Sequence, residues 1–103
     1  MQYLIDKAVK VILELYDPEE IILFGSYAKG DENLQSDIDL LIIKQTPLLR
    51  QHRGLDIVSH LKRFPQKFDL LFYTPSEILE KKQAPYSFIN SILISGISVH
   101  KKL

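Results

Sequence analysis

The sequence predicts an α/β domain in which helices pack against a small mixed β-sheet. A long amphipathic segment opens the chain, and short apolar runs typical of strands then alternate with further helical segments. The 103 residues suffice for one modest hydrophobic core and fall short of the length at which chains divide. We therefore expect a single domain over residues 1–103.

The first half of the chain supplies one long helix and two buried strands. Apolar residues recur at helical spacing over Gln2–Tyr16, with charged residues on the opposite face, and Pro18 follows the end of this helix. The all-apolar runs Ile21–Phe24 and Ile38–Ile43 are typical of strands that are buried on both faces. Between the two strands we expect a short helix over Ser26–Lys29 and then a polar loop.

The second half predicts three more helices and two more strands. Proline and glycine residues separate these elements, and a run of possible capping residues, Thr74–Glu77, marks one helix start. The expected elements are a helix over 48–64 that is weakened at Gly54, a strand over 67–73, a helix from the 74–77 start to about 83, a helix from 85 to a C-cap at Gly96, and a short edge strand over 97–100.

Composition excludes several classes of protein. Hydrophobic residues make up 46% of the chain and charged residues 25%, as in ordinary globular proteins, so disorder is not expected. Without cysteine there is neither a disulfide framework nor a thiolate metal site, which fits a reducing cytosol. No signal-peptide pattern is present, and no apolar run approaches the roughly 18 residues of a membrane span. We expect a cytoplasmic protein that does not enter a membrane.

Charge is balanced overall but unevenly placed. The formal net charge of zero argues against a protein that grips long nucleic acid through many phosphate contacts. Acidic residues dominate over 14–39, which suits cations, whereas bases dominate over 44–67. The basic stretch is either a solvated helix face or a contact surface for phosphates, RNA or an acidic partner, and Arg50 and Arg53 are its best candidates for such contacts.

Two aspartates mark the best candidate for chemistry. Asp37 and Asp39 open the second strand, so both side chains point to the same face, about 6.5–7 Å apart along the chain. Two unpaired carboxylates repel each other unless a cation lies between them. Oxygen ligands select a hard ion such as Mg²⁺ or Mn²⁺, whose coordination shell substrate phosphates often complete. Taken alone, an Asp-x-Asp pattern is more often a solvated strand end or a cap.

A small-residue turn lies ten residues before these aspartates. Gly25 and Ser26 follow the first predicted strand, where glycine allows close backbone approach and a following helix offers N–H groups to an anion. Phosphoryl or nucleotidyl transfer requires at least a phosphate-binding site and, beside it, carboxylates that can hold metal ions.

A third carboxylate interrupts the predicted strand over 67–73. Asp69 lies in an otherwise apolar and aromatic run, where an unpartnered buried carboxylate costs several kcal/mol. It is therefore expected at an exposed strand end, in a salt bridge, or beside a bound cation.

The spacing of these residues resembles a known signature. Gly-Ser, ten residues and Asp-x-Asp are similar to the motif of the DNA polymerase β-like nucleotidyltransferase superfamily, and GSYAKG…SDIDLLI resembles its minimal nucleotidyltransferases over nearly the whole chain. The resemblance implies the fold of that superfamily and a site for divalent metal ions. Lysine stands at position 29 where the family commonly has arginine, and it lacks the bidentate fork. The implied catalytic and metal-binding residues are Asp37, Asp39 and Asp69 with two Mg²⁺ ions, and the implied nucleotide-binding residues are Gly25, Ser26, Lys29 and Ser36.

The resemblance also implies a partner. Minimal nucleotidyltransferases are often antitoxins paired with an all-helical HEPN-domain ribonuclease toxin, which implies transfer of AMP from ATP to a toxin tyrosine. Larger members add domains that bind the acceptor, and this chain has no length left for one. Two alternatives remain open: a non-catalytic antitoxin that neutralises its partner by binding, and a homodimeric nucleotidyltransferase that acts on small molecules.

Overall fold

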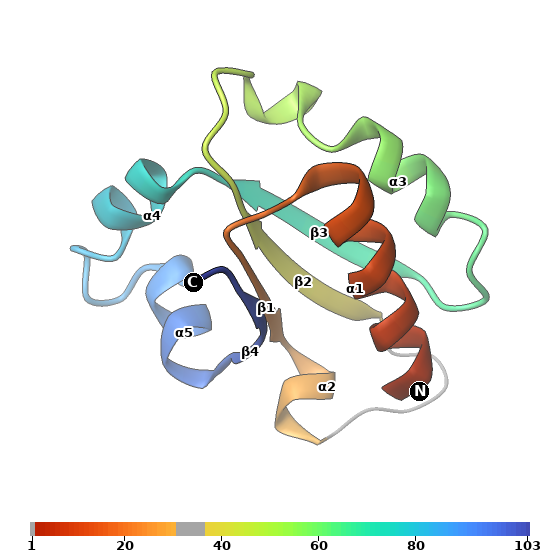
Figure 1. Ribbon diagram of the computed structural model, residues 1–103. Helices are drawn as coiled ribbons and strands as arrows, with labels where there is room; N and C mark the ends of the chain where they lie inside the picture. Colours follow the sequence, from red (N-terminus) through yellow and green to blue (C-terminus); the bar gives the residue numbers. More distant parts are fainter. Residues whose placement is uncertain (1, 31–36) are drawn as a thin grey trace.

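The computed structural model describes residues 2–30 and 37–103 and has the predicted α/β architecture. A four-stranded sheet lies at the centre, with helices on both of its faces (Figure 1). None of the described helices is long and apolar enough to span a membrane. The strands are β1 (Glu20–Phe24), β2 (Ile38–Ile43), β3 (Phe68–Tyr73) and β4 (Ile97–Lys101), and the helices are α1 (Gln2–Tyr16), α2 (Ser26–Lys29), the 3₁₀ helix η1 (Arg50–His52), α3 (Leu55–Leu61), α4 (Pro75–Lys81) and α5 (Phe88–Ser95).

The sheet is mixed, as the sequence predicted. Its strand order is β3-β2-β1-β4, with β1 antiparallel to both β2 and β4, and β2 parallel to β3. The parallel pair requires a crossover connection, which η1 and α3 provide. Within the described part of the chain, β3 and β4 are therefore the edge strands.

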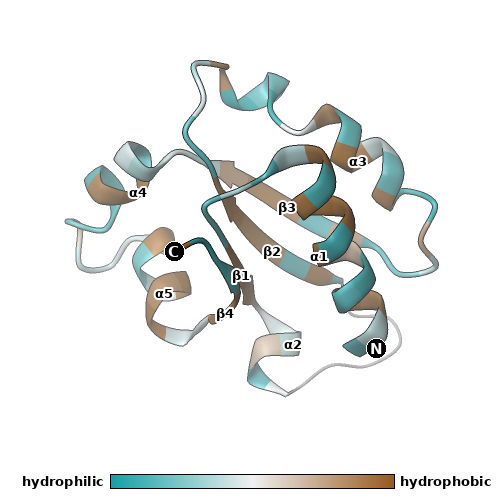
Figure 2. Cartoon of the chain, in the orientation of Figure 1, coloured by the Kyte–Doolittle hydropathy of each residue, from teal (hydrophilic) through white to brown (hydrophobic). Residues whose placement is uncertain are grey.

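Side-chain alternation along β2 divides the core into two clusters. Ile38, Leu40 and Ile42 pack on the face covered by α1 and α3, whereas Leu41 and Ile43 pack on the face covered by α4 and α5. Figure 2 shows the apolar colouring of β2 and of the helix sides that meet the sheet. Both faces of β2 are buried, which explains why its sequence is nearly continuous in apolar residues.

The predicted helix over 48–64 is wrong as a single element. The chain forms η1, then takes a positive φ of 65° at Gly54, and only then begins α3. A Cβ atom at Gly54 would lie 2.3 Å from the ring of Phe72, so glycine allows this segment to lie directly against β3. The weak point in the helical pattern is therefore a break, imposed by contact with a distant strand.

Both ends of helix α5 differ from what the sequence predicted. Helix α5 begins at Phe88 rather than at 85, because the Ser87 side chain caps it by accepting a hydrogen bond from the Asn90 backbone N–H at 3.0 Å. Gly96 does follow the helix, but in an extended conformation with φ −76°. Its Cβ would lie 2.5 Å from Cγ2 of Ile22, so glycine is needed there for packing rather than for a left-handed turn.

Arg53 has a structural role, so its predicted contact with a phosphate or a partner is wrong. The side chain is only 7% exposed. Its Nε donates to the Leu48 carbonyl at 2.8 Å, and Nη1 donates to the Phe72 carbonyl at 3.1 Å. The guanidinium also forms a bidentate pair with Glu77, at 2.8 and 3.1 Å. Arg53 thereby joins the crossover connection, the end of β3 and the start of α4.

Arg50, in contrast, stays partly exposed. Its guanidinium lies 4.2 Å from the centroid of the Tyr73 ring and 3.8 Å from a Glu77 oxygen, and its side chain is 47% exposed. A contact of Arg50 with a phosphate or a partner remains a prediction.

We predict that Glu77→Gln destabilises the fold in a pH-dependent way. Hydrogen bonds from Arg53 lower the pKa of Glu77 from 4.5 to about 2, so the charged pair stabilises the fold above about pH 4.5, and this stabilisation is lost as pH falls toward 2. Urea unfolding at pH 7 should show a loss of about 1.5–3 kcal/mol, the range for hydrogen bonds to charged groups.

The matched control is Glu80→Gln, an exposed residue on the same helix. Equal losses in the two variants, or a loss at Glu77 that does not shrink in acid, would contradict the proposed contribution of the pair.

Candidate functional site

Strand register brings Asp39 and Asp69 together. The parallel pairing of β2 with β3 places these two residues directly opposite each other, and the antiparallel pairing with β1 places Phe24 on the other side of Asp39. Partners in register point to the same face of a sheet. The expected proximity of Asp69 to the Asp-x-Asp strand is therefore observed, while the roles of both residues remain predictions.

Burial and the neighbouring carboxylates both raise the pKa of Asp39. Asp39 is half-buried, and burial is the main cause that raises its pKa above the usual value. The negative charges of Asp69 and Asp37 raise it further. The charges of Asp37 and Asp69 thus both act on Asp39 in the folded protein, and this accumulation of negative charge favours a cation near Asp39.

Asp37 lies just before β2 and faces a lysine. Its Oδ2 is 3.7 Å from Nζ of Lys67, whose side chain is 74% exposed. Such exposed pairs contribute little to stability, so Asp37 can exchange the lysine for another cation at small cost. Lys67 was not among the residues predicted for the site, although its position two residues before Asp69 would place it on the same face of a strand.

Gly25 lies directly against the Asp39 carboxylate. Its φ is 75°, a region that glycine adopts freely, and a Cβ atom there would lie 2.1 Å from Oδ2 of Asp39. The turn predicted to hold phosphates therefore meets the carboxylate predicted to hold metal. No side chain larger than hydrogen fits between them.

Helix α2 continues directly from this turn and forms a single turn of helix. It begins at Ser26, and Gly30 ends it in a left-handed conformation. Tyr27 anchors it, since this side chain is only 9% exposed and packs in the core with α1 and α3. Lys29 is exposed at the last position of α2, and the predicted nucleotide contact of Ser36 lies outside the described residues.

The donor chemistry of the site fits a hard divalent cation. Asp37, Asp39 and Asp69 offer only carboxylate oxygens, which Mg²⁺ and Mn²⁺ prefer. Among residues 2–30 and 37–103, however, no three histidine, cysteine, aspartate or glutamate side chains lie close enough to hold a metal ion as they stand. At least one of the three carboxylates would therefore have to move before all three could share an ion.

A comparison with known families decides the identity of the fold. The sequence profile described as "Polymerase beta, Nucleotidyltransferase" matches residues 7–102. The chain belongs to this family. It is therefore a nucleotidyltransferase, while the roles of the carboxylates and of the Gly25 turn remain predictions.

Two proteins of Methanocaldococcus jannaschii are similar to this nucleotidyltransferase in sequence. Both are provisionally named protein adenylyltransferases. One is 38% identical over 82 residues, which cover 79% of this chain and 78% of the relative. The other is 42% identical over 36 residues, which cover 35% of this chain and 36% of the relative.

Solved structures share the fold at low sequence identity. A nucleotidyltransferase assigned provisionally in Sulfolobus solfataricus superposes with a TM-score of 0.67 at 20% identity, covering 99% of this chain and 81% of that one. A toxin–antitoxin structure with AMP-PNP superposes with a TM-score of 0.53 at 18% identity, covering 94% and 73%. At these identities the likeness establishes the fold alone.

We predict that Gly25→Ala abolishes nucleotide binding. The new Cβ would displace the Asp39 carboxylate, which it meets at 2.1 Å. The matched control is Gly30→Ala, because Gly30 has a similar φ of 78° but has no heavy atom within 4 Å of the position of an added Cβ. Gly30→Ala should lose about 1–2 kcal/mol from left-handed backbone strain, and Gly25→Ala should lose more, because its ψ of −150° lies in a region essentially limited to glycine.

Calorimetric titration with ATP and Mg²⁺ then separates strain from contact. Only the Gly25 variant should lose binding, by at least about tenfold. Equal affinities of the two folded variants would show that the contact with Asp39 is irrelevant to the nucleotide.

We predict that Asp39→Asn stabilises the metal-free protein at neutral pH. The folded-state pKa of Asp39 is raised, so its ionisation disfavours the folded state at every pH above the unfolded value of about 3.9. Thermal unfolding in EDTA should give the variant a Tm a few degrees higher at pH 7 and no higher below about pH 3.5. Added Mg²⁺ should raise the Tm of the natural protein alone. An unchanged or lower Tm for the variant at pH 7 would contradict the repulsion.

Proposed function

We propose that this nucleotidyltransferase transfers AMP from ATP to a hydroxyl group of a protein acceptor and requires Mg²⁺. The observation that carries the proposal is the arrangement around Asp39, which lies between the Gly25 turn and Asp69. The names of the two sequence relatives support a protein as the acceptor. The 38% identity to one of them extends over most of both chains.

The residues divide the work of the reaction. The turn at Gly25 and Ser26 would hold the β- and γ-phosphates, with Lys29 and Ser36 as further candidates for nucleotide contacts. Asp37, Asp39 and Asp69 would hold two Mg²⁺ ions. When bound, these ions neutralise charge on the phosphates and on the attacking and leaving oxygens.

The proposed transfer of AMP forms one bond to the α-phosphorus of ATP and breaks another. The acceptor oxygen forms a bond to the α-phosphorus of ATP, the bond from that phosphorus to the β-phosphate bridging oxygen breaks, and pyrophosphate leaves. Asp69 is exposed and accepts the hydroxyl proton in this scheme. The protein contributes chiefly by positioning the reactants and by charge neutralisation.

The acceptor that we propose is a tyrosine of a HEPN-domain toxin, for which this chain would be the antitoxin. The family resemblance supports this choice, and a toxin–antitoxin structure shares the fold. Modification of the toxin by AMP would neutralise it. Neutralisation by binding alone would leave the toxin mass unchanged, so the two mechanisms differ in a measurable quantity.

We predict that the protein co-purifying with this chain gains mass in AMP-sized steps when it is incubated with ATP and Mg²⁺. Intact-mass spectrometry before and after incubation measures the gain. Asp37→Asn and Asp39→Asn should each abolish it, because each removes a carboxylate from the proposed metal site. The matched control, Asp56→Asn, changes an exposed aspartate in the first turn of α3 and should leave the gain unaffected.

The same experiment can overturn the proposal. A tight complex that gains no mass with any nucleoside triphosphate would support neutralisation by binding. Modification of sugars or aminoglycosides by a homodimer, with no protein modified, would support the small-molecule alternative.

A further inference from the structure

Strand β3 offers one open edge for backbone pairing. It pairs only with β2 in the described part of the chain. The carbonyls of Lys67 and Tyr73 accept hydrogen bonds from β2 and the residue after it, at 2.9 and 3.0 Å. In a parallel ladder every second residue faces the partner strand. Phe68 and Leu70 therefore direct their backbone groups outward, whereas the carbonyl of Phe72 is already bonded to Arg53.

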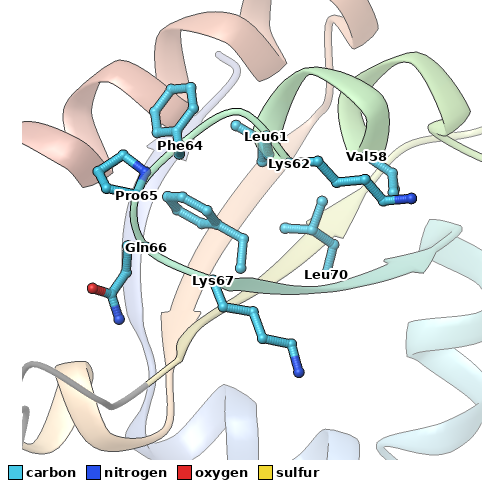
Figure 3. Close-up of a pocket in the computed structure, with 9 residues that line it drawn as sticks. Val58, Leu61, Lys62, Phe64, Pro65, Gln66, Lys67 and Leu70 are labelled. Atoms are coloured by element: carbon cyan, nitrogen blue, oxygen red, sulfur yellow. The ribbon is translucent and has the colours of Figure 1, made fainter.

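An apolar groove lies along this open edge, between α3 and β3. Its volume is about 490 Å³, and the apolar side chains that line it include Val58, Leu61, Phe68 and Leu70. Figure 3 shows Val58, Leu61 and Leu70 around the groove, with the connection from α3 to β3 closing one end. The groove is large enough for an aliphatic or aromatic side chain of a partner.

The groove and the carboxylates lie on opposite faces of the same strand. Phe68 and Leu70 pack with the cluster on the α1 and α3 face, and Asp69 between them points to the other face. A chain segment paired to the outer edge of β3 would alternate in the same way. One of its side chains would enter the groove, and the next would face Asp69.

The charge around the groove is basic. Lys62 and Arg63 are exposed there, whereas the ammonium group of Lys67 is paired with Asp37 at 3.7 Å. Figure 3 shows Lys62 above the groove and Lys67 extending away below it. Acidic side chains over the groove would therefore be attracted to Lys62 and Arg63, whereas the opposite face of β3 carries the exposed Asp69.

We propose that the edge of β3 binds an acidic, extended segment of the protein acceptor, with an apolar side chain in the groove and a hydroxyl-bearing neighbour facing Asp69. This inference rests on the proposed function and names how its acceptor is recognised. Backbone pairing supplies affinity in such strand addition, and the pocket supplies specificity. The hydroxyl oxygen bonds to the α-phosphorus of ATP, its proton passes to Asp69, and pyrophosphate leaves.

The test uses a fluorescent synthetic peptide with the sequence Glu-Asp-Leu-Tyr-Leu-Asp-Glu and the whole chain. Anisotropy measures peptide binding, and radiolabelled ATP with Mg²⁺ measures AMP transfer to the peptide. Replacing both leucines by serine should weaken binding at least about tenfold, because the groove then stays empty. Replacing the four acids by lysine should weaken it by a similar factor.

Two variants of the chain test the same surface without touching the carboxylates. Val58→Trp should fill the groove, and Lys62→Glu should reverse the charge beside it, so each should weaken peptide binding roughly tenfold. The lysine-containing peptide should regain affinity for the Lys62 variant. The matched control is Lys10→Glu, which changes an exposed lysine on α1 and should have no effect.

The outcomes separate this inference from the proposed function. No peptide binding, or binding that neither groove variant alters, would overturn the docking surface. A dimer of this chain that Val58→Trp dissociates, without peptide binding, would assign the edge to a second copy instead and would also overturn it. Groove-dependent binding without AMP transfer, or with transfer that Asp39→Asn leaves intact, would overturn the proposed chemistry and leave the docking surface standing.

Discussion

The cost of an ionised carboxylate at Asp39, which arises first from burial and then from repulsion by its neighbours, is the constraint on which the site depends. A half-buried carboxylate stands beside two others, at a position of β2 whose neighbours on that face, Leu41 and Ile43, are buried and apolar. The fold tolerates this cost because packing elsewhere along β2 is dense on both faces. A cation placed between the carboxylates would relieve this repulsion, which is why the site favours a bound cation.

The register of β3 against β2 fixes which carboxylates meet. A shift of one residue would turn Asp69 to the opposite face, away from Asp39. Contacts at the far end of the pair hold that register: Gly54 lies against Phe72, and Arg53 joins the Phe72 carbonyl to Glu77. The geometry of the site is thus maintained by residues that do not belong to it.

Local patterns in the sequence were enough to predict the elements that local chemistry decides. The helical period of α1 and the apolar run of β2 predicted both elements with their observed bounds, and the Gly25 turn and Asp37/Asp39 followed from spacing. Long-range contacts decided the rest. The break at Gly54 depends on a ring 18 residues later, and the burial of Arg53 depends on Glu77, which lies 24 residues away. No local pattern carries that information.

The open edge of β3 could also promote aggregation. The run Leu70–Tyr73 is apolar and aromatic, and such edges template pairing between identical chains. Asp69 places an exposed negative charge immediately before that run, where like charges of two chains would repel each other. The carboxylate in the candidate site therefore also opposes self-assembly, and a neutral residue at this position would remove that repulsion from the open edge.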